Sequence, residues 1–162
     1  LFPVMTGKGA LLKNSLLLIR GLQILGVPLI VTQQYTKGLG ETIPSIAKEI
    51  REFSFIEKRD FSCCGEPEVW KKLRELEARN ILICGIESHV CVLQTALDLK
   101  AAGYNPVIVT DAVSSRFESN LELAKERFRH EGIMMTSAES LLFELLGTSS
   151  AVEFKAVSNL IK

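Results

Sequence analysis

The 162-residue sequence lacks long apolar runs and carries no excess of either charge. No stretch approaches the roughly 18 consecutive apolar residues of a membrane-spanning helix, so we expect no membrane segment. The 19 basic side chains are balanced by 19 acidic ones and form no long basic run. Because a dedicated nucleic-acid binder displays such a run, we expect no nucleic-acid partner. Balanced charge instead favours self-association.

The sequence has few cysteines and no C-x-x-C pair. The four are Cys63, Cys64, Cys84 and Cys91, of which two are adjacent. Adjacent cysteines do not easily form disulfides that crosslink a domain, so we expect free thiols in a reducing, cytoplasmic compartment. The opening LFPVMTGKGALLKN also lacks the charged leader, apolar block and cleavage site of a signal peptide.

Hydrophobic periodicity predicts an alternation of helices and short strands. This alternation indicates one domain over 1–162 of the α/β class, with a Rossmann-like, doubly wound and mostly parallel sheet covered by helices on both faces. No strand precedes the first helix, although the first strand of such a sheet usually lies at its centre. Strands are expected at 28–34, 53–58, 80–86, 106–112 and 133–136, and helices at 8–25, 44–51, 66–79, 89–102, 118–131, 137–146 and 151–161.

Cys91 occupies the position most typical of a reactive thiol. It follows the apolar strand NILICGI and falls in the first turn of the next expected helix. Unpaired amides and the helix dipole there stabilise a thiolate, and the same amides can hold the oxyanion formed when the thiolate attacks a carbonyl. The alternative is a small buried cysteine without a chemical role.

The other cysteines give weaker signals. Cys84 lies within the apolar strand, and we expect its side chain to face the core. Cys63 and Cys64 precede a helix in a polar loop, and their spacing to His89 matches no metal-ligand pattern, so no metal site is expected. Asp111 follows a buried strand, where we expect it to cap a turn rather than contact substrate.

The stretches ILICGIESHVCVLQTALDLKAAGYNPVIVTDAVSSR and TQQYTKGLGETIPSI resemble the isochorismatase-like cysteine hydrolase superfamily, in particular its isochorismatase-domain proteins. The resemblance covers nearly the whole chain. It implies a Rossmann-like fold, an Asp–Lys–Cys catalytic set, homo-oligomers and no cofactor. Cys91 matches the nucleophile of the family, and Lys58, at the end of FSFIEK, matches its lysine. Without the resemblance, we would expect Lys58 to be a solvated surface lysine.

The family resemblance also implies a cis peptide in the turn before the cysteine, here between Ile86 and Glu87. The backbone N–H groups of Glu87 and Cys91 would then form the oxyanion hole, with the Glu87 side chain directed away from the pocket. We expect substrate contacts from five residues at the carboxyl ends of the strands and in the opening loop. These are Phe2, Gln34, Tyr35, Ile86 and His89.

Two departures from the family pattern qualify this interpretation. The catalytic aspartate of the family ends the first strand, and LFPVM resembles the loop after it, so we expect both to lie upstream of Leu1 and the chain to be incomplete at its N-terminus. The region after the second strand, TQQYTKGLG, lacks the metal ligands of nicotinamidases. The sequence therefore predicts a metal-free hydrolase of a small amide or carbamoyl C–N bond that works through a thioester. The alternative is a catalytically silent binding or assembly module.

Overall fold

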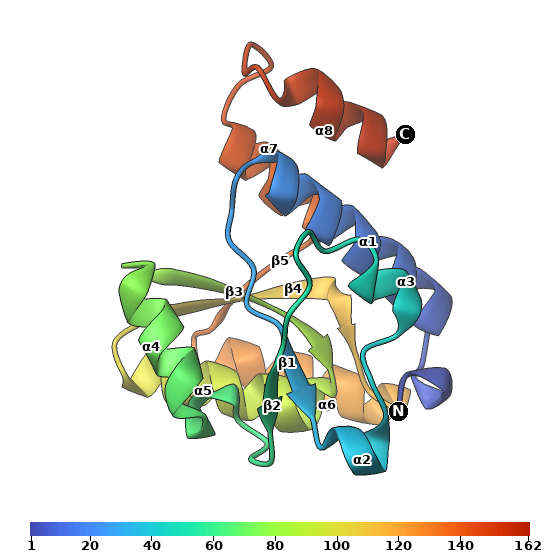
Figure 1. The fold of residues 1–162 in the computed structure, drawn as a ribbon, viewed down its shortest axis with the longest axis vertical. Helices are drawn as coiled ribbons and strands as arrows, with labels where there is room; N and C mark the ends of the chain where they lie inside the picture. The colour runs from blue at the N-terminus through green and yellow to red at the C-terminus, as the bar shows by residue number, and fades with distance from the viewer.

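Five parallel strands form two separate sheets in the computed structural model, which describes residues 1–162 (Figure 1). One sheet has the order β1–β2 and the other the order β3–β4–β5. The strands are β1 (Thr32–Gln34), β2 (Ile56–Lys58), β3 (Asn80–Ile86), β4 (Asn105–Ser114) and β5 (Met134–Thr136).

Helices flank both sheets, and none is both long and apolar enough to cross a bilayer. The α-helices are α1 (Lys8–Ile24), α2 (Thr36–Leu39), α3 (Pro44–Ala47), α4 (Pro67–Glu75), α5 (Leu93–Ala101), α6 (Glu118–His130), α7 (Ala138–Leu146) and α8 (Phe154–Ile161). Short 3-10 turns lie at η1 (Phe2–Val4) and η2 (Cys63–Gly65), and a π-helical turn lies at η3 (Ser88–Val92).

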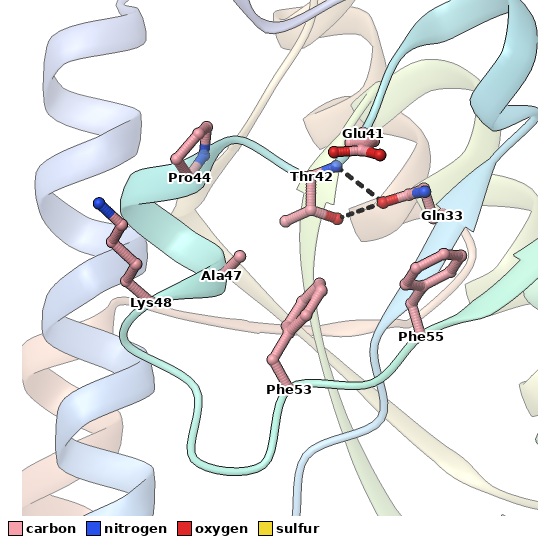
Figure 2. A pocket seen from close by; sticks show the side chains of 8 residues that line it. All are labelled: Gln33, Glu41, Thr42, Pro44, Ala47, Lys48, Phe53 and Phe55. Atoms are coloured by element: carbon pink, nitrogen blue, oxygen red, sulfur yellow. Dashed lines mark hydrogen bonds between the residues drawn. The ribbon is translucent and has the colours of Figure 1, made fainter.

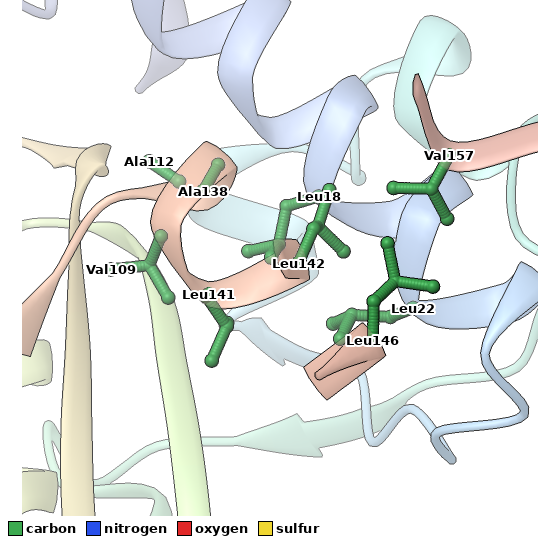
Figure 3. Close-up of a cluster of buried hydrophobic side chains, with 9 residues drawn as sticks. All are labelled: Leu18, Leu22, Val109, Ala112, Ala138, Leu141, Leu142, Leu146 and Val157. Carbon is green, nitrogen blue, oxygen red and sulfur yellow. The ribbon is translucent and has the colours of Figure 1, made fainter. Parts of the chain in front are cut away.

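Strand β4 carries the core because helices cover both of its faces. Val109 packs in one apolar cluster with Leu18 of α1 and Leu142 of α7 (Figure 3). The preceding residue of the strand, Ile108, packs with Phe128 of α6 in a second cluster. Successive side chains of a strand point to opposite faces, so α1 and α7 cover one face and α5 and α6 the other. The predicted α/β class is confirmed.

A sheet that lacks its first, central strand was expected, and β1 and β3 are indeed not paired with each other. Residues 28–31 were expected in a strand, yet β1 begins only at Thr32. Its ladder with β2 joins three residue pairs, and no strand supports its other edge. Strand β3 likewise pairs only with β4, although its sequence is apolar throughout. Its residues 81–83 are consequently only half-buried.

Several predicted boundaries also shift. The short helix expected at 44–51 ends at Ala47, and α2 forms in a stretch expected to be a loop. Strand β4 extends to Ser114, two residues beyond its expected end, because Ser114 pairs with Ile86 of β3. This longer pairing brings the segment after β4 beside the turn that contains Cys91.

Candidate active site

Cys91 lies in the π-helical turn η3, between the end of β3 and the start of α5. An α-helical first turn was expected here, so the predicted helix start is corrected to a π-helical one. Such turns occur frequently at functional sites. Cys91 is half-buried, so it is neither sealed in the core nor fully solvated.

The backbone at Glu87 offers an unused hydrogen-bond donor. The Ile86–Glu87 peptide is cis, which confirms that prediction. The Glu87 carbonyl accepts bonds from Val90 and Val92, each at 3.2 Å, but the Glu87 N–H donates to no acceptor in the chain. Glu87 is only 6% exposed, and unpaired N–H groups are rare in buried surroundings. The hydroxyl of the adjacent Ser88 is also buried without a partner. Two unsatisfied polar groups therefore lie at the end of β3, three to four residues before Cys91.

The Glu87 side chain is bound by the segment after β4. Its carboxylate accepts a bond from the Arg116 backbone N–H at 2.9 Å and bonds from Arg116 Nε at 3.1 and 3.2 Å. The carboxylate is therefore occupied by Arg116 and is not a free acid or base.

Lys58 is buried, at 4% exposure, which is contrary to the solvated alternative. Its Nζ donates to Gln34 Oε1, to the Asp60 carbonyl at 2.9 Å and to the Phe61 carbonyl at 2.8 Å. No carboxylate of the chain forms an ion pair with Lys58. A buried cation held only by neutral oxygens gains strongly from a nearby anion.

The loop after Lys58 packs against the helix that follows Cys91. The Cys63 N–H donates to Thr95 Oγ1 at 2.9 Å, and Thr95 lies one helical turn beyond Cys91. The Cys63 thiol contacts Thr32 of β1 at 3.3 Å. Through these contacts, the loop after β2 is anchored to the start of β1 and to α5.

The predicted substrate-binding residues fall into two groups. Gln34 and Tyr35 belong to the Lys58 side. Gln34 bonds both Lys58 and the Arg59 carbonyl, and the Tyr35 ring lies 3.8 Å below the Arg59 guanidinium. Gly38 packs so closely on Tyr35 that a Cβ there would lie 2.3 Å from the ring.

Ile86, His89 and Phe2 belong to the Cys91 side. Ile86 precedes the cis peptide. His89 Nδ1 lies 2.9 Å from Ser115 Oγ, and its Nε2 lies 3.4 Å from Asn120 Nδ2, so both ring nitrogens contact protein groups. These contacts make His89 a link between η3 and α6. Phe2 lies in η1, which the Thr6–Ser115 backbone bond holds beside the segment after β4.

Asp111 and Cys84 differ in how well they match expectation. Asp111 Oδ1 accepts a bond from the Ala138 N–H at 2.8 Å and so caps α7, a structural role on a more distant element than its own turn. Cys84 was expected to face the core but is exposed, because the edge of β3 beside it is open. Enough protein surrounds Cys84 to raise its pKa to about 11 by desolvation.

We expect Cys64 and Cys84 to react slowly with iodoacetamide at neutral pH. Desolvation raises the pKa of each thiol from 9.0 to about 11, so the thiolate becomes about 100-fold scarcer. A more basic thiolate is also more nucleophilic, and this difference offsets about tenfold of the loss in reaction rate. Because a raised pKa favours the neutral thiol, labelling of both residues should rise about tenfold per pH unit between pH 7 and 9. Peptide mass spectrometry measures this slope, and pH-independent labelling would contradict the assignment.

The chain also contains a cavity of about 410 Å³ between α3, β1 and the 53–55 loop (Figure 2). None of the predicted site residues lines it. Its most buried polar residue is Gln33, whose Oε1 accepts bonds from the Thr42 N–H and hydroxyl and whose Nε2 donates to Thr36. The side chain of Gln33 is thus already satisfied by hydrogen bonds within the chain.

Comparison with known proteins agrees with the fold. The model of the isochorismatase domain matches residues 4–140. The chain is 42% identical over 145 residues to the "Secreted isochorismatase effector Isc1" of Phytophthora sojae, which covers 86% of this chain and 69% of that protein. It is 40% identical over 146 residues to "Isochorismatase domain-containing protein 1" of Salmo salar, covering 90% of this chain but only 51% of the salmon protein. The chain thus spans about half the length of that relative.

A solved structure extends the similarity to three dimensions. The structure named "MAR1 Ribonuclease" from Caenorhabditis elegans superposes with a TM-score of 0.93 at 36% sequence identity. The superposition covers 98% of this chain and 82% of the nematode chain.

Proposed function

Because this chain belongs to the isochorismatase family, we propose that it is a cysteine hydrolase of a small amide or carbamoyl C–N bond. The observation that carries the proposal is the free N–H of buried Glu87, close in sequence to the half-buried Cys91 thiol. A donor without an acceptor beside a nucleophile suits an oxyanion that forms only during reaction. Family membership supports the hydrolase class, and the substrate within that class belongs to the proposal.

The proposed reaction has two steps. The Cys91 thiolate attacks the substrate carbonyl, and the backbone N–H groups of Glu87 and Cys91 bind the resulting oxyanion. The C–N bond then breaks, and the nitrogen leaves with a proton from a general acid while a thioester remains on Cys91. Water then attacks the thioester and gives a proton back to the general acid, the acyl group leaves as a carboxylic acid, and the Cys91 thiolate is regenerated. The buried Lys58 ammonium stabilises negative charge in the site, and no cofactor takes part.

We also propose that an additional parallel strand lies between β1 and β3. This strand would carry the catalytic aspartate of the family, which would act as the general acid. Support comes from the free edges of β1 and β3, which belong to parallel ladders and pair with no further strand of this chain. Strand β3 also has half-buried apolar residues and the exposed Cys84. A further strand beside β3 would bury more of these side chains. We assign this strand to residues upstream of residue 1 in a longer protein.

Intact mass and hydrogen exchange test the additional strand. The protein isolated from its natural source should be heavier than the 17.9 kDa of this chain. Amides of β3 should exchange at least about tenfold more slowly in it than in the 162-residue chain, since a paired edge opens less often. A natural mass equal to that of this chain would refute the assignment.

The hydrolase proposal is tested with the activated ester p-nitrophenyl acetate. We expect a rapid release of one equivalent of nitrophenol and an acetyl group on the peptide that contains Cys91. A screen of small amides then identifies the substrate, with an RNA oligonucleotide included because of the name of the nematode neighbour. The alternative, a silent binding module, predicts acylation of Cys91 no faster than that of Cys64, and this result would overturn the enzyme proposal.

A further inference from the structure

We propose that the Glu87 side chain and Arg116 form a positioning pair that aims the Glu87 N–H at the reacting carbonyl. This inference rests on the proposed function and adds two side-chain roles to it. Neither group needs to touch the substrate, because the pair acts on the orientation of the backbone turn.

The pair is asymmetric in its exposure and its bonds. The Glu87 side chain is 8% exposed, whereas the Arg116 side chain is 50% exposed. The carboxylate is held from two directions, by the Arg116 backbone N–H at 2.9 Å and by Nε at 3.1 and 3.2 Å. Any residue at position 116 other than proline can supply the first bond, but the second needs the guanidinium. The Glu87 carboxylate is therefore the more critical partner.

The segment that holds Glu87 is itself fixed on several sides. Ser114 Oγ donates to the Thr6 carbonyl at 2.6 Å, and Thr6 Oγ1 donates to the Arg116 carbonyl at 3.1 Å. Ser115 contacts His89 of η3 and accepts the Thr6 N–H at 3.0 Å. Segment 114–116 is consequently a rigid support rather than a free loop, and a bond to it restrains the peptide plane of residue 87.

The effect of such restraint on a reaction can be estimated. Each oxyanion donor contributes about 10²–10³-fold to rate, and a misplacement of about 1 Å costs roughly 10²-fold. Hydrogen bonds to an ionised acceptor are roughly twice as strong as neutral ones. Loss of the carboxylate should therefore reduce carbonyl attack by about 10- to 100-fold. Direct alkylation of the thiol forms no oxyanion and should not depend on the pair.

Two probes of Cys91 separate these effects. p-Nitrophenyl acetate measures carbonyl attack, and iodoacetamide measures the thiol alone, each resolved by peptide mass spectrometry. In Glu87→Ala, the ratio of the acylation rate to the alkylation rate should fall at least about tenfold. Glu87→Gln keeps one acceptor oxygen and should recover part of the ratio. Arg116→Ala keeps the backbone bond and should fall less than Glu87→Ala.

Glu49→Gln is the matched control, because Glu49 binds Arg20 through two bonds of 2.7 and 2.8 Å between α1 and the α3 region. Its ratio should equal that of the original chain. An unchanged ratio in both Glu87 variants, or an equal fall in Glu49→Gln, would overturn the positioning role. If Cys91 of the unaltered chain is not acylated, the proposed function fails and the pair fails with it. If Glu87→Ala does not fold, Glu87→Gln and Arg116→Ala decide the result.

Discussion

Replacing Cys91 with alanine is expected to eliminate acetylation of the turn by p-nitrophenyl acetate. Turnover of the true substrate should fall on the order of 10⁴-fold or more, because the atom that forms the covalent bond is gone. Cys91→Ser should be similarly inactive, since a hydroxyl at this position has no adjacent base among the contacts of the chain to remove its proton. The measurements are the nitrophenol burst and the mass of the 88–92 peptide.

The control for this substitution is Cys64→Ala, which removes a half-buried thiol whose pKa desolvation raises to about 11. It should leave the burst intact. Because Cys91 is only half-buried, Cys91→Ala should still fold, which thermal unfolding verifies. A full burst in the folded Cys91→Ala variant would exclude the thioester mechanism.

The turn around Cys91 was the part of the site best suited to prediction from sequence. Its information is local, because an apolar strand, a tight connection and a helix start follow one another within residues 80–93. Family resemblance added the cis peptide at Ile86–Glu87, which the structure has. The π-helical form of the turn was missed because hydrophobic spacing does not distinguish the first turn of a π-helix from that of an α-helix.

The missing pairing between β1 and β3 was expected, because no strand precedes the first helix, but its effect on the exposure of β3 was not. An apolar run such as NILICGI indicates a strand that is suited to burial on both faces. It does not tell whether the neighbouring strand is present, and pairing partners decide exposure. Cys84 illustrates the limit: its surroundings in sequence are those of a core residue, yet it is exposed at an unpaired edge.

Contacts between residues that lie far apart in the sequence could not be predicted from local patterns either. Glu87 and Arg116 are 29 residues apart and meet because β3 and β4 pair in parallel as far as Ile86 and Ser114. Lys58 is polar and lies at the end of a short strand, which favours a solvated position. Its burial depends on the fold of residues 59–61 over its ammonium group. Such satisfaction of a buried charge emerges only from tertiary structure.

Lys58→Met is the second substitution with a large expected effect. It keeps much of the side-chain length and removes the positive charge, so a thiolate or oxyanion in the site loses the stabilisation of a buried cation. We expect acylation of Cys91 to fall about 10²-fold. The free energy of unfolding should fall by about 1–3 kcal/mol, because Gln34 Oε1 and the carbonyls of Asp60 and Phe61 lose their donor.

Two further variants show whether charge or geometry matters at position 58. Lys58→Arg keeps the charge but replaces a compact three-donor ammonium with a planar group, so it should recover only part of the acylation rate. Lys8→Met is the control, because the exposed Lys8 ammonium also bonds a backbone carbonyl, that of Pro3 at 3.0 Å, without being buried. If Cys91 in Lys58→Met is acylated at a rate within twofold of that in the unaltered chain, the Lys58 ammonium only orders the loop of residues 59–61. A large loss would instead mean that the same ammonium that orders residues 59–61 also stabilises charge at the thiol.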